Sequence, residues 1–206
     1  MRRMRATWNT GGILLVLCGV FALVTPGALG PGLGVGVAGA GAVLYAAAVL
    51  VFAIGFSRAA SVVLRRPLGL TAMVVVAVWP LVARPVGEAL SAGGPGPSVA
   101  ARAFWAVDLV VSLGAALIAA VRIGRTGVIP RPWAWAPLWA LGVFVVCAVV
   151  PQLVAVGAPS AGVELVPLFS VLGAIGSLAG TLGLGILALV LAAQLRPGSV
   201  EILRTR

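Results

Sequence analysis

The sequence predicts an all-α protein, a polytopic bundle of transmembrane helices that forms one domain over residues 1–206. Three observations carry this prediction. Of the 206 residues, 62% are hydrophobic and only 9% are charged, and the mean hydropathy is +1.20. The apolar residues fall into six long runs, and a transmembrane helix needs about 20 such residues. The basic residues are all arginines, and they collect in alternate gaps between these runs.

Taken in order along the chain, six apolar runs predict six spans. We place them at residues 11–28, 33–56, 68–83, 103–123, 133–156 and 166–195. The third is the shortest and contains Pro80, and the sixth is long enough to tilt in the bilayer. The polar stretch from Arg84 to Arg102 is predicted to be a loop. The six spans pair into three helical hairpins.

The arginines predict which side of the membrane each gap faces. One side holds twelve of them: Arg2, Arg3, Arg5, Arg58, Arg65, Arg66, Arg122, Arg125, Arg131, Arg196, Arg204 and Arg206. Arg84 and Arg102 lie on the other side, with Glu88 and Glu164. Because short arginine-rich loops stay in the cytoplasm, both termini are predicted to be cytoplasmic. We expect a bacterial cytoplasmic (inner) membrane, with the bilayer and its anionic headgroups as partners of the inner arginines.

An alternative interpretation concerns the first 28 residues. Their basic start and apolar run also fit a cleaved signal peptide. The segment around Pro26 makes a poor small-x-small cleavage site, which favours a retained helix. The charge pattern of the later gaps is the same in both cases.

Several function classes find little support in the composition. The net charge of +10 does not indicate nucleic-acid binding, because the arginines are separated by apolar runs. The chain has no histidine and only four acidic residues, which predicts no metal site and no cofactor. No serine or threonine has a recognisable activating base, so we predict that the protein is not an enzyme. Cys18 and Cys147 are expected to act as small apolar side chains.

Asp108 is the acidic residue that falls inside a predicted span. It lies roughly 9 Å from the outer end of that span, where an unpaired carboxylate costs a few kcal/mol. Ser112 is one turn deeper, Gln152 lies in the outer third of the fifth span, and Arg84 and Arg102 lie on the same side. In one interpretation Asp108 pairs with Arg84 or Arg102 and orients helices. In the other, these polar groups line a pocket in which Asp108 binds a cation or a proton.

Small residues four positions apart allow two helix backbones to approach closely. This spacing predicts helix-packing positions at Gly32 with Gly36, Gly173 with Ser177, and Gly176 with Gly180. Such stripes serve either packing within one bundle or contact with a second copy of the chain.

The first predicted hairpin starts at Trp8, has Gly12 and Gly19 seven residues apart, and reaches Pro26 after an apolar run. Over residues 8–55 this pattern resembles the HdeD family of small bacterial membrane proteins. The resemblance implies six spans arranged as hairpins and a link to acid resistance, and it implies no catalytic residues. Pro80 and Pro85 are partial equivalents of the pattern in the second hairpin.

The function predicted from these observations is a non-enzymatic structural, stress-response or partner-binding role, with a homo-oligomer or another membrane protein as partner. The alternative is a small transporter, or a transporter subunit, with its polar site near Asp108.

Overall fold

The computed structural model describes residues 2–23, 30–55, 67–92, 98–125, 133–157 and 165–194. The regular structure in these segments is helical throughout, which confirms the predicted all-α class. The helices are α1 (Arg2–Leu23), α2 (Gly30–Ile54), α3 (Pro67–Ser91), α4 (Val99–Arg125), α5 (Ala136–Gly157), α7 (Val166–Leu178) and α8 (Leu184–Gln194). A π-helical segment, η3 (Ala179–Gly183), joins α7 to α8, so these three form one continuous helix.

Five helices in the described part of the chain are long and apolar enough to cross a membrane. Their apolar stretches are Met4–Leu23, Gly36–Ile54, Pro67–Ser91, Val99–Arg125 and Pro167–Gln194. The helix α5 adds a shorter apolar stretch, Ala136–Pro151. Helices satisfy their own backbone hydrogen bonds, as lipid requires, so a chain of this make-up is a multi-pass helical membrane protein.

The polar stretch between Arg84 and Arg102 is mostly helical, and its prediction as a loop was wrong. The helix α3 continues through Pro80 and Pro85 to Ser91, and α4 starts at Val99. Each internal proline removes one backbone hydrogen bond. The residues that follow are compatible with a helix and continue it. The Arg84 and Glu88 side chains also pair one turn apart, at 3.1 Å. The Ser98 hydroxyl accepts a 3.0 Å hydrogen bond from the Ala101 amide and so caps the start of α4.

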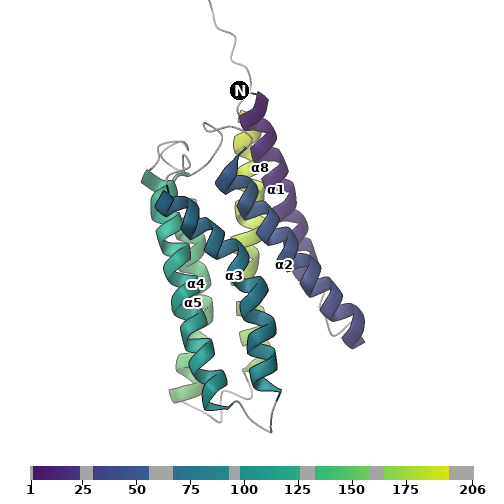
Figure 1. Cartoon of the computed structure of the whole chain (residues 1–206), viewed down its shortest axis with the longest axis vertical. Coiled ribbons are helices and arrows are strands. Elements are labelled where there is room, and N and C mark those ends of the chain that lie inside the picture. The colour runs from purple at the N-terminus through teal and green to yellow at the C-terminus, as the bar shows by residue number, and fades with distance from the viewer. Residues whose placement is uncertain are drawn as a thin grey trace, which may run out of the picture.

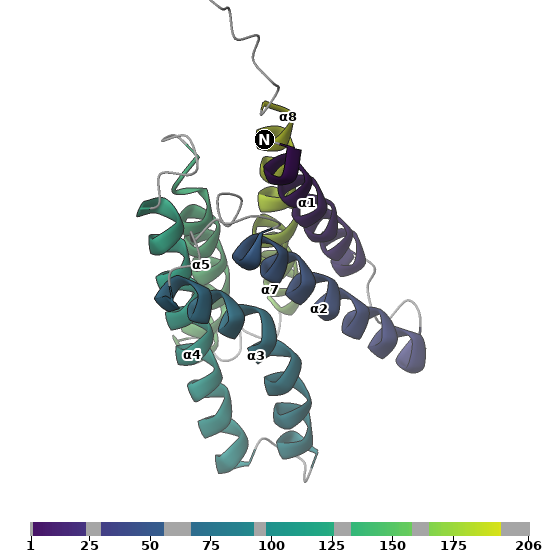
Figure 2. The ribbon, with the colours of Figure 1, turned by 45° about the horizontal axis from the view of Figure 1, so that its top comes forward.

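The six helices close into a ring in which each packs on the next in sequence (Figures 1 and 2). The ring closes because the last helix returns along α1, with α8 and α1 side by side in both views. The start of α1 and the end of α8 therefore lie at the same end of the bundle (Figure 1). The helices α4 and α5 are the least closely packed neighbours around the ring.

Glycines on α1 and α8 allow these two helices to approach each other closely. A methyl group placed on Gly185 would lie 3.0 Å from the Leu15 Cβ and from the Val16 backbone nitrogen. One placed on Gly12 would lie 2.9 Å from the Leu189 Cγ. These separations are too short for a side chain, so the two helices meet backbone to backbone.

The predicted packing stripes behave differently from this contact. A methyl group on Gly36, Gly173 or Gly180 would meet no described atom within 4 Å, so these positions do not pack within the bundle. Gly176 does pack, since a methyl group placed there would lie 3.2 Å from the Cys147 Cβ. Gly32 lies in α2, and its surroundings fall outside the described part of the structure. Spacing alone does not tell which face of a helix meets a neighbour, and the alternative use of such stripes, contact with a second copy of the chain, stays a prediction.

Candidate functional site

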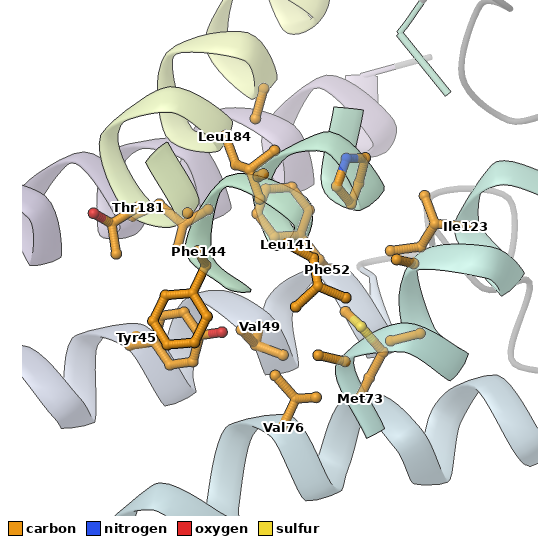
Figure 3. A pocket seen from close by; sticks show the side chains of 18 of the residues that line it. Tyr45, Val49, Phe52, Met73, Val76, Ile123, Leu141, Phe144, Thr181 and Leu184 are labelled. Atoms are coloured by element: carbon orange, nitrogen blue, oxygen red, sulfur yellow. The ribbon is translucent and has the colours of Figure 1, made fainter. Parts of the chain in front are cut away.

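The centre of the ring contains a cavity of about 490 Å³, and all six helices contribute to its wall. Figure 3 shows side chains converging on it from different parts of the chain. Those labelled there are Tyr45, Val49, Phe52, Met73, Val76, Ile123, Leu141, Phe144, Thr181 and Leu184. The lining residues run from Trp8 near the start of the chain to Leu191 near its end, so the cavity brings together residues that are far apart in the sequence.

The cavity exists because a ring of six helices has a wide centre and small residues face it. Ala116, Ala119, Ala120, Ala140 and Gly180 all line the space. These side chains are too short to meet across the ring, and the packed core beside the cavity is likewise rich in alanine. On α4 the lining residues run from Ser112 to Ile123, which corresponds to a length of about 17 Å along the helix axis.

The described wall of the cavity is apolar apart from a few hydroxyls and two indoles, and none of its side chains is charged. The Thr181 hydroxyl donates to the Ser177 carbonyl at 2.8 Å and is satisfied within its own helix. Trp8 packs edge-to-face on Phe52, with ring centroids 5.8 Å apart. The buried Trp8 Nε1 has no hydrogen-bond partner in the described part of the chain. The wall therefore suits a largely apolar occupant.

A polar cluster lies at the end of the cavity remote from Arg122 and Arg125. The indole Nε1 of Trp79 donates a 2.7 Å hydrogen bond to Asp108 Oδ1, which joins α3 to α4. The Ser112 hydroxyl donates to the same oxygen at 3.4 Å. Ser112 also lines the cavity, whereas Asp108 does not, so the carboxylate lies one hydrogen bond behind the wall.

The structure brings together only some of the residues that the sequence singled out. Asp108 and Ser112 are in contact. Arg84 is bound to Glu88 on the exposed surface instead of to Asp108. In the described part of the chain the Asp108 carboxylate accepts hydrogen bonds from Trp79 and Ser112, whereas Arg84, one of its two predicted partners, pairs with Glu88. Asp108 and Ser112 are therefore the members of the predicted cluster that the described part of the structure brings into contact.

Two further predicted residues lie beyond what the structure describes. Gln152 falls within α5, but its side chain is outside the described part, and so is Glu164. No group of three or more potential metal ligands occurs among the described residues.

Trp79 is the site residue that sequence reasoning missed. Tryptophans of membrane helices usually mark the interfaces, whereas Trp79 lies 12 residues into the 25-residue α3, next to Pro80. That position was the available signal, since a buried indole usually finds a hydrogen-bond acceptor. The acceptor is 29 residues away in sequence, and only the packing of α3 on α4 identifies it.

Comparison of the chain with protein-family models, curated proteins and solved structures finds no match. The fold and the cavity define the class of this chain as a multi-pass helical membrane protein with an apolar central cavity. The resemblance of residues 8–55 to the HdeD family stays a prediction.

Proposed function

We propose that this chain is a non-enzymatic membrane protein that binds an apolar molecule from the bilayer in its central cavity. Of the roles predicted from the sequence, a binding role is the one that the cavity favours over a purely structural role, with a small apolar molecule in place of the predicted protein partner. Binding cavities for small molecules have volumes of about 300–1,000 Å³, largely apolar walls and a few polar groups. The 490 Å³ space at the centre of the ring has these properties.

The side chains around the cavity lack packing contacts on the side that faces its centre. An apolar wall that faces empty space loses the dispersion contacts of a packed interior. An acyl, prenyl or aromatic group inside the cavity would restore these contacts. The bilayer supplies such groups at high concentration.

We also propose the full topology of six spans in three hairpins, with both termini cytoplasmic, in a bacterial inner membrane. The position of the α1 start and the α8 end at one end of the bundle supports an even number of crossings. The arginine pattern supports the cytoplasmic assignment of that end.

Transport is the second candidate, and one observation favours it. Ser112 both lines the cavity and contacts Asp108, so an ionisable group adjoins the binding space. Ionisable residues within membrane spans commonly mark ion or substrate pathways. Proton-coupled flux in proteoliposomes that is lost in Asp108→Asn would support transport, and flux unchanged by this substitution would count against it.

The binding proposal is testable with two matched glycine substitutions on the last helix. Gly180 lines the cavity and Gly173 does not, and neither has a described atom within 4 Å of an added methyl group. Leucine at Gly180 should therefore fill part of the cavity without a clash, whereas leucine at Gly173 should leave the cavity open.

The measurement is energy transfer from the protein's tryptophans to the neutral apolar probe diphenylhexatriene, with the protein in lipid nanodiscs. We expect saturable transfer in the unaltered protein and in Gly173→Leu, and at least several-fold weaker binding in Gly180→Leu. Transfer that rises without saturation and equally in all three proteins would show only probe dissolved in lipid, and would contradict the proposal.

A further inference from the structure

We propose that the molecule bound in the cavity is a lipophilic cation, an apolar body that carries an amine or a quaternary ammonium group. This inference rests on the proposed function, that the cavity binds an apolar molecule, and adds the charge of that molecule. Its basis is the juxtaposition of an uncompensated carboxylate, a hydroxyl in the cavity wall and several aromatic rings.

The negative charge of Asp108 is not balanced by the groups that donate hydrogen bonds to it. The two hydrogen bonds to its carboxylate come from neutral donors, the Trp79 indole and the Ser112 hydroxyl, and both reach Oδ1. Neutral donors orient and stabilise a carboxylate but do not cancel its charge. A carboxylate within a membrane span normally has a countercharge or marks a functional path.

Among the described residues, no charged side chain forms an ion pair with Asp108. On α3, Arg84 forms its ion pair with Glu88, so the two charges offset each other on the exposed surface. On α4, Arg102 precedes Asp108 by six residues, about 9 Å along the helix, and its side chain is exposed. The described cavity wall contributes no charged side chain from any other helix. A positive group on a ligand would supply what the cluster lacks.

Ser112 connects the cavity to this charge. Ser112 is the cavity-lining residue of α4 nearest to Asp108, and its hydroxyl contacts Oδ1 at 3.4 Å. A hydroxyl that donates to a carboxylate still has lone pairs to offer to an ammonium group. A cation at this end of the cavity therefore interacts with Ser112 directly and with Asp108 from one hydrogen bond further away.

Aromatic side chains in the cavity wall also favour a cationic ligand. Tyr45, Phe52 and Phe144 lie around the cavity (Figure 3). The face of an aromatic ring attracts an organic cation, and more strongly where water is excluded. The negative charge of an anionic amphiphile, such as a fatty acid, would gain nothing from these rings and would be repelled by Asp108. A neutral lipid would use the apolar wall but not the polar end.

The test compares two probes that share one apolar body, neutral diphenylhexatriene and its trimethylammonium derivative. Both report by energy transfer from tryptophan in nanodiscs, after correction for probe dissolved in protein-free nanodiscs. At about 8 Å and an effective dielectric constant near 20, loss of one opposite charge weakens binding on the order of 30-fold. We therefore expect Asp108→Asn to weaken binding of the cationic probe by about this factor and to leave the neutral probe unchanged.

Glu88→Gln is the matched control, because it also removes one carboxylate near the α3–α4 pair but at an exposed position away from the cavity. It should change the affinity of neither probe. If Asp108→Asn weakens both probes equally, Asp108 acts only through the fold, and the inference is overturned.

A second measurement needs no substitution and so is independent of folding. Tetraphenylphosphonium and tetraphenylborate have the same shape and opposite charge, and each can compete with the bound cationic probe in the unaltered protein. After the same correction, we expect displacement by the phosphonium at concentrations at least tenfold lower than by the borate. Equal displacement would overturn the charge inference and leave the binding proposal standing, whereas absence of saturable binding by either probe would overturn the binding proposal itself.

Discussion

Asp108 shows how a single polar residue is accommodated in an apolar helix pair. A carboxylate within a membrane helix costs up to about 2.5–3.5 kcal/mol on insertion scales, the value at the centre of the helix. The 2.7 Å bond from the Trp79 indole offsets part of this cost and ties α3 to α4. The charge itself stays uncompensated by this bond, which is why the same residue carries the functional proposal.

The Trp79–Asp108 bond should contribute measurable stability. We expect Trp79→Phe to lower the free energy of unfolding by about 1–2 kcal/mol, because the carboxylate loses a charge-assisted donor. In a double-mutant cycle with Asp108→Ala, the coupling between the two residues should be about 0.5–2 kcal/mol, the range found for hydrogen bonds between membrane helices. The measurement is reversible unfolding in mixed detergent micelles.

Trp139→Phe is the control for this cycle, because Trp139 is 76% exposed in α5 and its loss removes no described side-chain bond. A coupling energy of zero between Trp79 and Asp108 would show that the indole bond adds nothing to stability in the membrane.

At the scale of the helices, the association of α1 with α8 depends on glycine. Phe52 of α2 packs against α1 in the same way, since a methyl group on Gly11 would lie 2.6 Å from its ring. The π-helical segment η3 adds one residue per turn and so changes the face that α8 presents after α7. Gly185 then lies against Leu15 and Val16.

Substitutions should distinguish the glycine at this helix contact from a glycine that faces no neighbouring helix. We expect Gly185→Val to destabilise the protein by about 1–3 kcal/mol, because the new side chain would overlap the α1 backbone. By contrast, Gly36→Ala should be neutral or stabilising by up to about 1 kcal/mol, since alanine favours the helix and meets no described atom within 4 Å. Thermal unfolding in detergent measures both, and a similar loss at the two positions would contradict the assigned packing.

At the scale of the whole molecule, the closed ring explains both the cavity and the position of the chain ends. Six helices that each pack on two neighbours leave a centre that small side chains do not fill. Since the helices alternate in direction, the ring returns α8 to the end of the bundle at which α1 starts (Figure 1).

The proposed topology can be measured with reporter fusions. Alkaline phosphatase fused after Arg206 should be inactive and green fluorescent protein at the same site should fluoresce, because the arginine-rich end is cytoplasmic. Phosphatase fused after Ser91, at the end of α3, should be active. Phosphatase activity at Arg206 would mean an odd number of spans, and N-terminal sequencing of the purified protein would show whether the first helix has been cleaved.

Composition and run length were sufficient to predict the all-helical class and the membrane. Lipid cannot hydrogen-bond to the backbone, so long apolar runs have few structural options. The ends of the helices were harder to predict, as the helical residues Arg84–Ser91 show. The polarity of a segment distinguishes a position in lipid from a position in water, but it does not distinguish a helix from a loop outside the lipid.

The sequence by itself therefore determined that this chain is a multi-pass helical protein, because hydropathy and helix periodicity are local properties. Only the tertiary structure decided which glycines pack, that Trp79 is the partner of Asp108, and that the six helices surround a cavity. Each of these features depends on the rotation of one helix against another. That rotation is set by the sum of many small contacts between distant parts of the chain.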